Sequence, residues 1–290
     1  MAWLSKILAP VAFSPRCQGA TQYAETLACH FQAELDLLHV VPPHLGVFTA
    51  PEAGAYTTAA EITEERVAQS TKQLARYPQE PCPQVAVRRE VVTGDPAHEI
   101  VRCARDGGCD LIVMATHGYG PFRRFLLGSV TAKVLHDAPC PVWTGPHLEQ
   151  APEYDSIHFQ RVLCAVDLSH ASSTVLQWAG RFASDFGAKL DVVHVLPHSL
   201  VQVGGMYFDP EWRERAVQAA REQIGRLQQG CGTAGEVWIE FGEPPAAVRE
   251  IAASRKADLL VIGRGREGLH GLRTMAYGIL RESPCPVAAI

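Results

Sequence analysis

The sequence KILAPVAFS at residues 6–14 returns as RVLCAVDLS at residues 161–169, which lies 155 positions further along the chain. The following segment behaves in the same way, since AELDLLHVVP from Ala33 returns as AKLDVVHVLP from Ala188 at the same spacing. Self-similarity at a fixed spacing indicates that one folding unit has been duplicated. These two pairs of segments therefore predict two copies of a single fold.

Later segments repeat at shorter spacings. GDPAHEIVRCARDGG from Gly94 matches GEPPAAVREIAASRK from Gly242 at a spacing of 148, and APCPV from Ala138 matches SPCPV from Ser283 at 145. The second copy has therefore lost seven residues (155 − 148) and then three more (148 − 145). A chain of 290 residues also suits two domains by length alone. We predict a first domain over residues 1–147, a polar linker over 148–160 and a second domain over 161–290.

Within the first copy, strand and helix patterns alternate. Short runs rich in Val, Ile and Leu at residues 7–13, 35–41, 85–92 and 111–115 are typical of strands that are buried on both faces. Strands separated by single helices predict right-handed crossovers and a doubly wound, mostly parallel α/β sheet with helices on both faces. In such a sheet, ligands bind beyond the carboxyl ends of the strands.

Candidate helix starts follow two of these strands. Ser14 and Ser169 stand where an N-cap residue is expected, and Asp95 and Glu243 each precede a proline that suits the first helical turn. We therefore predict helices that begin directly after these positions.

The composition excludes several functional classes. The chain is 47% hydrophobic and 20% charged with a net charge of −5, which argues against nucleic-acid binding by bulk electrostatics. No apolar run is long enough to predict a membrane span. The nine cysteines include no C-x-x-C pair, so neither a zinc ribbon nor a thioredoxin-type motif is predicted, and reduced thiols favour a cytoplasmic location. Small ligands and other proteins remain as partners.

The segment ATHGYGPFRRFLLGSVT at residues 115–131 is the strongest candidate for a ligand site. Small residues let backbone N–H groups approach an anion, and a helix starting at Gly128 and Ser129 would direct unpaired amides at it. The Ser129 or Thr131 hydroxyl then adds a hydrogen bond or reaches a metal ion carried by the ligand. A second interpretation stays open, in which the glycines only permit a tight turn between strand and helix. No metal site formed by the protein itself is predicted.

Taken together, these segments resemble the universal stress protein family over essentially the whole chain, twice. The resemblance rests on A-T-H-G-x9-G-S-V-T from Ala115, V-L-x-x-A-P-C-P-V from Val134, I-L-x-x-V-x-F-S from Ile7 and L-L-H-V-V from Leu37. It implies two Rossmann-like, five-stranded domains related to the adenine nucleotide alpha hydrolases. It also implies that the G-x2-G-x9-G-S motif holds ATP phosphates, with or without magnesium, and that the first strand ends in an Asp that contacts the nucleoside. The nucleotide-binding residues implied in the first domain are Pro10, Ala12, Phe13, Ser14, Val40, Met114, Ala115, His117, Gly118, Arg124, Gly128, Ser129, Val130 and Thr131, with Asp167 and Gly263 as remnants in the second.

The two copies depart from the family pattern in opposite ways. The first copy carries Ala12 at the position of the nucleoside-contacting Asp, which the second copy keeps as Asp167. The second copy keeps Gly263, but Arg266 replaces the next glycine and the following loop is three residues shorter. We therefore expect the first domain to hold ATP and the second to fail.

The function implied is that of a universal stress response protein that binds ATP or a related adenine nucleotide as a sensor or regulator and is not a dedicated enzyme. The alternative is an interaction module, or a hydrophobic-ligand-binding module, whose nucleotide sites have decayed. The family resemblance further implies that the terminal strands at residues 141–144 and 286–290 pair within one chain as a pseudo-dimer. Association of two such chains into a homodimer, and a role of the loop at 43–60 as lid or connector, stay open.

Overall fold

The computed structural model describes residues 3–43, 48–49, 56–57, 59–78, 82–116, 127–145, 157–196, 210–265 and 271–290. The described chain divides into two compact units, the first reaching Trp143 and the second running from His158 to Ile290. None of the described helices is both long enough and apolar enough to cross a membrane. The expected pairing of the two terminal strands concerns how the units associate, and it stays a prediction.

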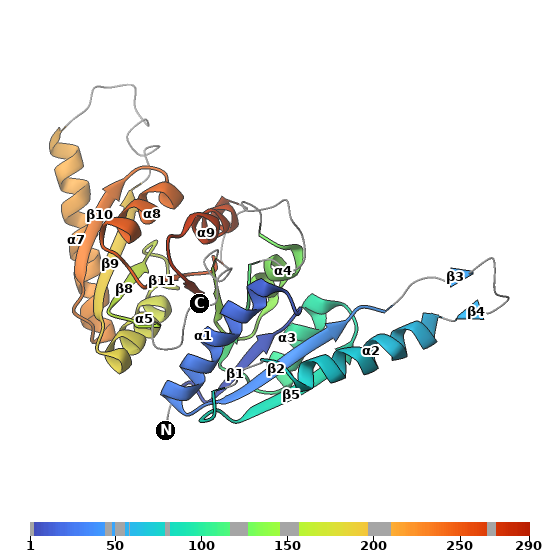
Figure 1. The fold of residues 1–290 in the computed structure, drawn as a ribbon. Helices are drawn as coiled ribbons and strands as arrows, with labels where there is room; N and C mark the ends of the chain where they lie inside the picture. Colours follow the sequence, from blue (N-terminus) through green and yellow to red (C-terminus); the bar gives the residue numbers. More distant parts are fainter. Residues whose placement is uncertain are drawn as a thin grey trace. The chain divides into compact units, whose positions relative to one another are not determined.

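Unit 1 is built on parallel strands in the order β7-β6-β1-β2-β5 (Figure 1). A short antiparallel pair, β3 and β4, lies in the connection between β2 and α2. The elements are β1 (Lys6–Pro10), α1 (Pro15–Phe31), β2 (Glu34–Val41), β3 (Phe48–Thr49), β4 (Tyr56–Thr57), α2 (Ala59–Ala75), β5 (Val87–Thr93), α3 (Pro96–Asp106), β6 (Leu111–Val113), α4 (Ser129–Asp137) and β7 (Val142–Thr144).

Unit 2 repeats this topology with the strand order β10-β9-β8-β11-β12. Its elements are β8 (Arg161–Ala165), α5 (Ser172–Phe186), β9 (Lys189–Leu196), α7 (Pro210–Cys231), β10 (Glu236–Phe241), α8 (Pro244–Ser254), β11 (Leu259–Ile262), α9 (Gly271–Glu282) and β12 (Val287–Ala289). Strands β1 and β8 start 155 positions apart, as do β2 and β9, so the repeat seen in the sequence is a repeat of structure. The predicted α/β fold, with two copies of a doubly wound parallel sheet, is confirmed.

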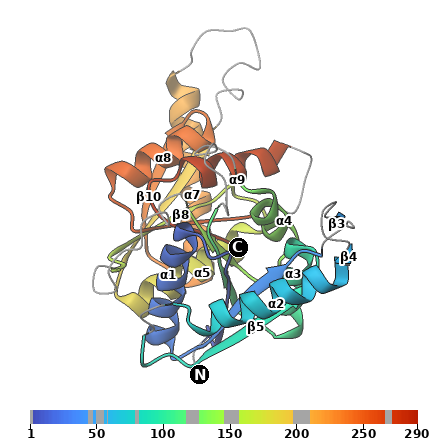
Figure 2. The same ribbon diagram turned by 45° about the vertical axis from the view of Figure 1, so that its right-hand side comes forward.

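Helices cover both faces of each sheet (Figures 1 and 2). Crossovers between parallel strands are right-handed. The helices that connect the first, second and third strands of a unit therefore cover one face of its sheet, and the helices that connect the third, fourth and fifth strands cover the other. In unit 1, α1 and α2 therefore share one face, while α3 and α4 pack against each other on the opposite face. In unit 2 the corresponding pairs are α5 with α7 and α8 with α9.

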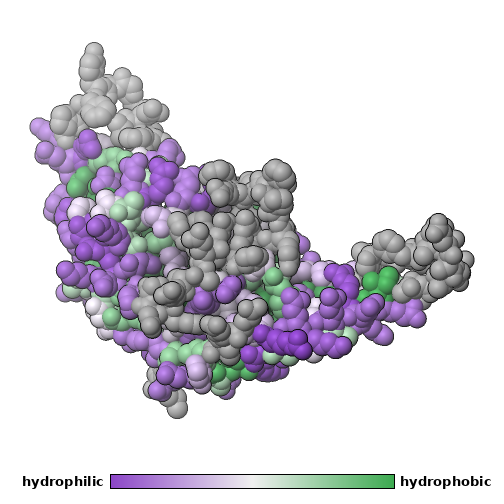
Figure 3. Space-filling model, viewed as in Figure 1, coloured by the Kyte–Doolittle hydropathy of each residue, from purple (hydrophilic) through white to green (hydrophobic). Residues whose placement is uncertain are grey.

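The central strands form the core because both of their faces are covered. In unit 1, Ile7, Leu111 and Trp143 have no exposed surface, and in unit 2 the ring of Phe182 stacks on Trp178 at 5.3 Å. Figure 3 shows mostly hydrophilic residues over the visible surface, with hydrophobic ones in scattered patches. Met275 is the one large hydrophobic residue classed as exposed among the described residues.

One carboxylate fastens the start of the central strand in each unit. Asp110 Oδ2 accepts hydrogen bonds from Ser5 N (2.7 Å), Ser5 Oγ (2.7 Å) and Lys6 N (3.0 Å). Asp258, its counterpart 148 positions later, accepts from the backbone N–H groups of Gln160 and Arg161 at 2.8 and 2.9 Å. These bonds tie β1 to the residue before β6, and β8 to the residue before β11, which fixes the relative register of the central strands.

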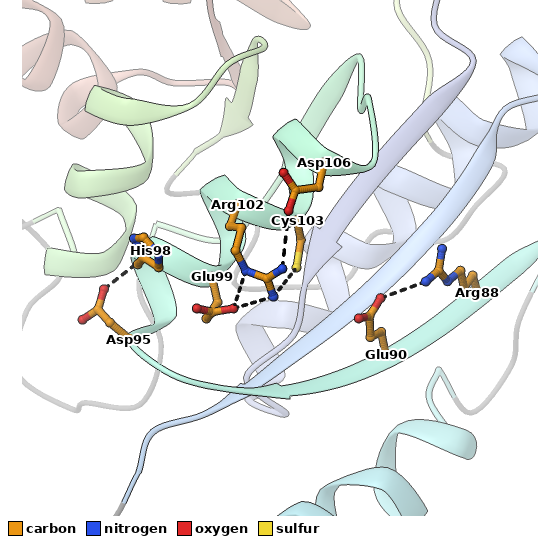
Figure 4. A network of polar contacts seen from close by, with 8 residues as sticks. All are labelled: Arg88, Glu90, Asp95, His98, Glu99, Arg102, Cys103 and Asp106. Atoms are coloured by element: carbon orange, nitrogen blue, oxygen red, sulfur yellow. Dashed lines mark hydrogen bonds and ion pairs between the residues drawn. The ribbon is translucent and has the colours of Figure 1, made fainter.

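The predicted helix starts are correct after the third strand of each unit. Asp95 accepts a hydrogen bond from His98 N at 3.0 Å, and an ion-pair network of Arg102 with Glu99 and Asp106 follows on the same helix (Figure 4). Glu243 occupies the same N-cap position in unit 2 without a side-chain cap bond. Gly94 precedes α3 at φ +156°, where a Cβ would come within 2.6 Å of the Glu99 side chain.

Of the two N-cap predictions after the first strands, that of Ser14 is confirmed and that of Ser169 is wrong. Ser14 is the N-cap of α1, although its side chain makes no cap hydrogen bond. Ser169 is not an N-cap, because α5 begins only at Ser172 with Ala171 before it. The physical reason is that Asp167 accepts hydrogen bonds from both Ser169 N and Ser172 Oγ, which folds this segment into a turn ahead of the helix.

We predict that Asp110→Ala lowers the free energy of unfolding of unit 1 by about 2 kcal/mol, since it removes the acceptor of three hydrogen bonds at a strand start. Urea unfolding followed by circular dichroism measures this. Asp106→Ala is the matched control, because this exposed carboxylate only pairs with Arg102 at 3.4 Å, and it should change stability by less than about 0.5 kcal/mol. Equal effects of both substitutions would contradict the role given to Asp110.

Candidate functional site

A cavity of about 550 Å³ lies in unit 2 beyond the carboxyl ends of β8, β9 and β11. This is the place where open parallel sheets bind ligands. Most of its wall is apolar. The lining side chains come from the turn after β8, the first turn of α5, the ends of β9 and β11, and the helices α7, α8 and α9; among them are Val166, Val175, Val193, Leu196, Ala216, Ala220, Val248, Ile262, Met275 and Ile279.

Asp167 is an ionisable group at the rim of this cavity. Its Oδ1 accepts hydrogen bonds from Ser169 N and Ser172 Oγ, both at 2.9 Å. Burial opposes ionisation, but these hydrogen bonds outweigh it and hold the pKa of Asp167 below its ordinary value. The side chain is therefore a carboxylate at neutral pH.

A histidine stands at the same place in each unit. His194 Nδ1 lies 2.8 Å from the carbonyl oxygen of Val166, and His39 Nδ1 lies 2.7 Å from that of Val11. A carbonyl oxygen only accepts, so Nδ1 carries the proton and donates it, which leaves Nε2 as an acceptor in the neutral ring. Burial, which outweighs the bond to Val11, lowers the pKa of His39. Because His194 also lines the cavity, unit 2 offers an acceptor there beside the Asp167 carboxylate.

The hydrogen-bonded residues Asp167 and Ser172 of unit 2 are both replaced in unit 1. The positions of Asp167 and Ser172 are held by Ala12 and Cys17, each 155 residues earlier. The Cys17 thiol instead lies 3.3 Å from both Ala12 N and Ser14 Oγ. No carboxylate is therefore offered at this position of unit 1, as the sequence predicted from Ala12.

The residue after this position has a left-handed backbone in both units. Phe13 has φ +54° and Leu168 has φ +62°, a conformation that costs a bulky residue about 1–2 kcal/mol. The Phe13 ring packs on His39 at 4.5 Å and on Tyr77 at 6.0 Å. An aromatic cluster thus adjoins the predicted nucleoside position of unit 1, where unit 2 has the aliphatic Leu168.

The first glycine of the phosphate motif, Gly263 in unit 2, is replaced in unit 1 together with the residue that it packs against. A Cβ on Gly263 would lie 3.4 Å from Val175 Cγ2, whereas in unit 1 Ala115 packs against Ala20. Ala115 and Gly263 are 148 positions apart, and Ala20 and Val175 are 155 apart, so each pair occupies the same place. The larger residue at one position accompanies the smaller residue at the other, so the two units fill the same place with different side chains.

The start of α4 is tied to the end of β6 in unit 1. Gly128 N donates to the carbonyl oxygen of Thr116 at 2.9 Å, and the buried Thr131 hydroxyl donates to the carbonyl oxygens of Ala115 and Thr116 at 3.1 and 3.2 Å. The Thr131 hydroxyl proton is therefore already used in hydrogen bonds within the protein. The N–H groups of Ser129, Val130 and Thr131 have no partner among the described residues, as expected for a first helical turn.

Helix α9 of unit 2 starts differently. It begins at Gly271, three residues before the position 274 that matches Ser129 by the spacing of 145. Ala276 takes the place of Thr131, so the hydroxyl tether is lost. Met275 matches Val130 by the same spacing, and its side chain lines the cavity of unit 2. The three-residue deletion thus goes with a helix that starts one turn earlier, and the first-turn amides of the two units are not equivalent.

The remaining predicted residues of unit 1 fall into two groups. Pro10 ends β1 half-buried, while Ser14, Val40 and Met114 are buried beneath the site. His117, Gly118 and Arg124 lie outside the described residues, as does Arg266 in unit 2. In the described part of the chain, no cluster of three or more His, Cys, Asp or Glu side chains could hold a metal ion.

A second cavity, of about 810 Å³, lies at the opposite edge of unit 2. Its polar lining includes Arg161 and Arg255, which both pair with the buried Asp191, at 3.4 and 3.1 Å. These ion pairs lie at the amino ends of β8 and β9, away from the carboxyl ends where such sheets bind ligands. The smaller cavity is therefore the candidate site.

The comparisons with known proteins agree with this architecture. The model of the universal stress protein family matches residues 4–144 and again 158–290. The chain belongs to the universal stress protein family. A universal stress protein of Mycolicibacterium smegmatis is 26% identical over 98% of this chain and 96% of its own length. One of Methanocaldococcus jannaschii is 34% identical over 47% of this chain and 79% of its own length.

Solved structures support the tandem universal stress protein fold. The crystal structure of a universal stress protein from Archaeoglobus fulgidus covers 98% of this chain and 95% of its own, with a TM-score of 0.67 and 22% identity. This likeness concerns the fold. The family assignment and the repeat of its domain, both predicted from the sequence, are confirmed.

Sequence analysis missed part of the site of this universal stress protein. Ser172 and its counterpart Cys17 were not singled out, although the spacing of 155 aligns them and their change accompanies that of Asp167 to Ala12. The cavity walls from α7 and α9 were missed too. Pairs such as Ala216 and Ala220 have helical spacing, but this spacing does not tell a cavity wall from a packed face.

We predict that Asp167→Ala lowers the stability of unit 2 by about 1 kcal/mol at pH 7, because Ser172 Oγ and Ser169 N lose their acceptor. The pKa of Asp167 is lower in the folded state, so this contribution is present above the unfolded pKa of about 4 and is lost as pH falls through the folded pKa. Urea unfolding of both proteins from pH 7 to pH 3 measures the difference. The exposed Glu214→Ala is the control, and a difference that grows on acidification would contradict the prediction.

Proposed function

We propose that this universal stress protein binds an adenine nucleotide, ATP in the first instance, and acts as a regulator through its bound state. The observation that carries the proposal is the first turn of α4 in unit 1, which the Thr131 hydroxyl ties to the end of β6 and whose amides have no partner among the described residues. Such amides suit a phosphate, and the largely apolar cavity at the carboxyl ends of β8, β9 and β11 in unit 2 suits a purine base. We also propose that the protein works in the cytoplasm.

The two units support different halves of this ligand. Unit 2 supports nucleoside binding, since its cavity of about 550 Å³ has the size of a small-molecule site and presents Asp167. Unit 1 supports phosphate binding, because α4 begins after Gly128 with three amides that have no partner among the described residues, at the positive end of the helix dipole. We propose that the triphosphate binds in unit 1 at Gly118, Gly128 and Ser129. Losing one nucleoside hydrogen bond through Ala12 costs about 0.5–1.5 kcal/mol, which weakens binding without abolishing it.

A regulatory role is supported by what the polar groups already do. Asp167 is bonded to Ser169 and Ser172, while His194 donates through Nδ1 to a backbone carbonyl and not to a carboxylate. The imidazole therefore lacks the carboxylate partner that orients a catalytic base in a triad. We propose no catalytic residue, and slow hydrolysis of bound ATP would be incidental.

A second candidate function is supported by the walls of the same cavity. Val175, Val248, Ile262 and Ile279 are among the apolar residues that surround it, and the helix facing it starts with a different geometry from that of α4. An apolar ligand in unit 2 would use these walls without needing phosphate contacts. This is the sequence-based alternative of a hydrophobic-ligand-binding module.

We predict that the full chain binds magnesium ATP and that Gly128→Val weakens this binding at least about tenfold, or 1.4 kcal/mol, by placing a side chain at the start of α4. Gly128 has φ −61° and ψ 145°, which valine adopts without strain, so the variant should fold. Isothermal titration calorimetry measures the affinity. Lys133→Val, on the exposed side of the same helix, is the control and should bind as the parent does.

The matched variant in unit 2 is Ala216→Phe, which fills the cavity from α7. If it abolishes ATP binding while Gly128→Val does not, the assignment of ATP to unit 1 is wrong. Heat with an apolar fluorescent probe but none with ATP or adenosine favours the second function. No binding of ATP at millimolar concentration with magnesium would remove the proposed function.

A further inference from the structure

Two cysteines distant in sequence are brought together in unit 1. Cys29 lies on α1 one turn after Glu25, and both side chains bond to the segment that leads into β5. Glu25 Oε1 accepts from Cys82 N at 3.4 Å, and the Cys29 thiol donates to Gln84 Oε1 at 3.0 Å. Because residues four apart share one helix face, these two bonds lay the segment 82–84 across that face, with Cys82 next to Cys29.

We infer that Cys29 and Cys82 form a reversible intramolecular disulfide that fastens the segment before β5 to α1. Both side chains are half-buried, so an oxidant can reach them, whereas Cys17, Cys109, Cys140, Cys164 and Cys285 are buried. The remaining half-buried cysteines, Cys103 and Cys231, stand on α3 and α7.

The electrostatics of the pair agree with close approach. Burial, and after it the neighbouring Cys82 thiol, raises the pKa of Cys29. Cys29 is therefore mainly a neutral thiol at pH 7, so only its small thiolate fraction reacts with an oxidant and the oxidation is slow. In a reducing compartment such a bond is transient and serves as a switch.

The oxidant is a peroxide, and the step balances without any other reactant. One thiol releases its proton, and the thiolate attacks a peroxide oxygen and becomes a sulfenic acid, while the O–O bond breaks and the departing hydroxide takes up that proton as water. The second thiol likewise releases its proton, and its thiolate attacks the sulfenic sulfur, so that the S–S bond forms, the S–O bond breaks and the departing hydroxide becomes the second water. Two thiols and one hydrogen peroxide give one disulfide and two waters, and a dithiol reverses the change.

The disulfide would act on the neighbourhood of the candidate site, an effect that rests on the proposed function. The same stretch of chain carries Tyr77, whose hydroxyl bonds to Thr21 Oγ1 of α1 at 3.1 Å. Its ring contacts Phe13, which packs on His39. Fastening residue 82 to α1 holds this aromatic cluster in place, so oxidation should change ATP affinity in unit 1.

The test uses the reduced full chain with one equivalent of hydrogen peroxide, followed by alkylation and digestion after glutamate. This digestion separates Cys29, on residues 26–34, from Cys17. We expect one cross-linked species joining Cys29 to Cys82, seven alkylated cysteines out of nine, and full reversal by dithiothreitol. Cys29→Ser and Cys82→Ser should each abolish the cross-link, while Cys103→Ser keeps it.

Unfolding supplies the structural control. In denaturant the two thiols lie 53 positions apart on a flexible chain, so the yield of this cross-link should fall at least about tenfold. Nine alkylated cysteines after oxidation of the folded chain, a different pairing, or equal yield in denaturant would overturn the inference. A cross-link that forms without changing ATP affinity would retain the disulfide and remove only its link to the site. Absence of ATP binding to the reduced chain would count against the proposed function alone.

Discussion

The hydrogen bond from a histidine Nδ1 to a backbone carbonyl, present once in each unit, is the interaction on which the candidate sites depend. His39 bonds to Val11 and His194 to Val166, so the end of the second strand holds the turn that leaves the first strand. That turn contains a left-handed residue directly after Ala12 in unit 1 and after Asp167 in unit 2. Without this hydrogen bond, the turn would lack the support that stabilises its unfavourable backbone conformation.

The two units have diverged by exchanging neighbouring residues together. Asp167 and Ser172 form a hydrogen-bonded pair, and both are replaced in unit 1, by Ala12 and Cys17. Had only the aspartate been lost, a serine hydroxyl would have been left without its acceptor, which costs about 1–3 kcal/mol when it is buried. At a second place, Gly263 beside Val175 in unit 2 corresponds to Ala115 beside Ala20 in unit 1. One side chain is larger and its neighbour is smaller, so the change in volume at one position accompanies an opposite change at the other. Each unit is therefore internally consistent with a different ligand environment.

Much of the fold could be predicted from the sequence because its signals are strong and repeated. The Val-, Ile- and Leu-rich runs predicted the parallel strands, and Asp95 before a proline predicted the start of α3. The first strand was predicted to reach Phe13 but ends at Pro10, since Phe13 turns the chain with a left-handed backbone that propensity disfavours for a bulky residue. The prediction of Ser169 as an N-cap was wrong because its backbone N–H donates to Asp167 and α5 begins only at Ser172. These errors lie at the candidate site, where local preference gives way to the geometry of the turn.

The candidate site could be predicted only in part, because hydrogen bonds decide which groups remain available to a ligand. Thr131 matches the phosphate motif, yet its hydroxyl proton goes to the carbonyl oxygens of Ala115 and Thr116. In the proposed function, what Thr131 would offer a phosphate is its backbone amide, which that same hydroxyl holds in place. In unit 2 the matching residue is Ala276, and the helix starts a turn earlier. The loss of one hydroxyl therefore removes the tether that holds the first-turn amides against the end of the neighbouring strand, and the proposed phosphate site of unit 1 would depend on this tether as well as on its glycines.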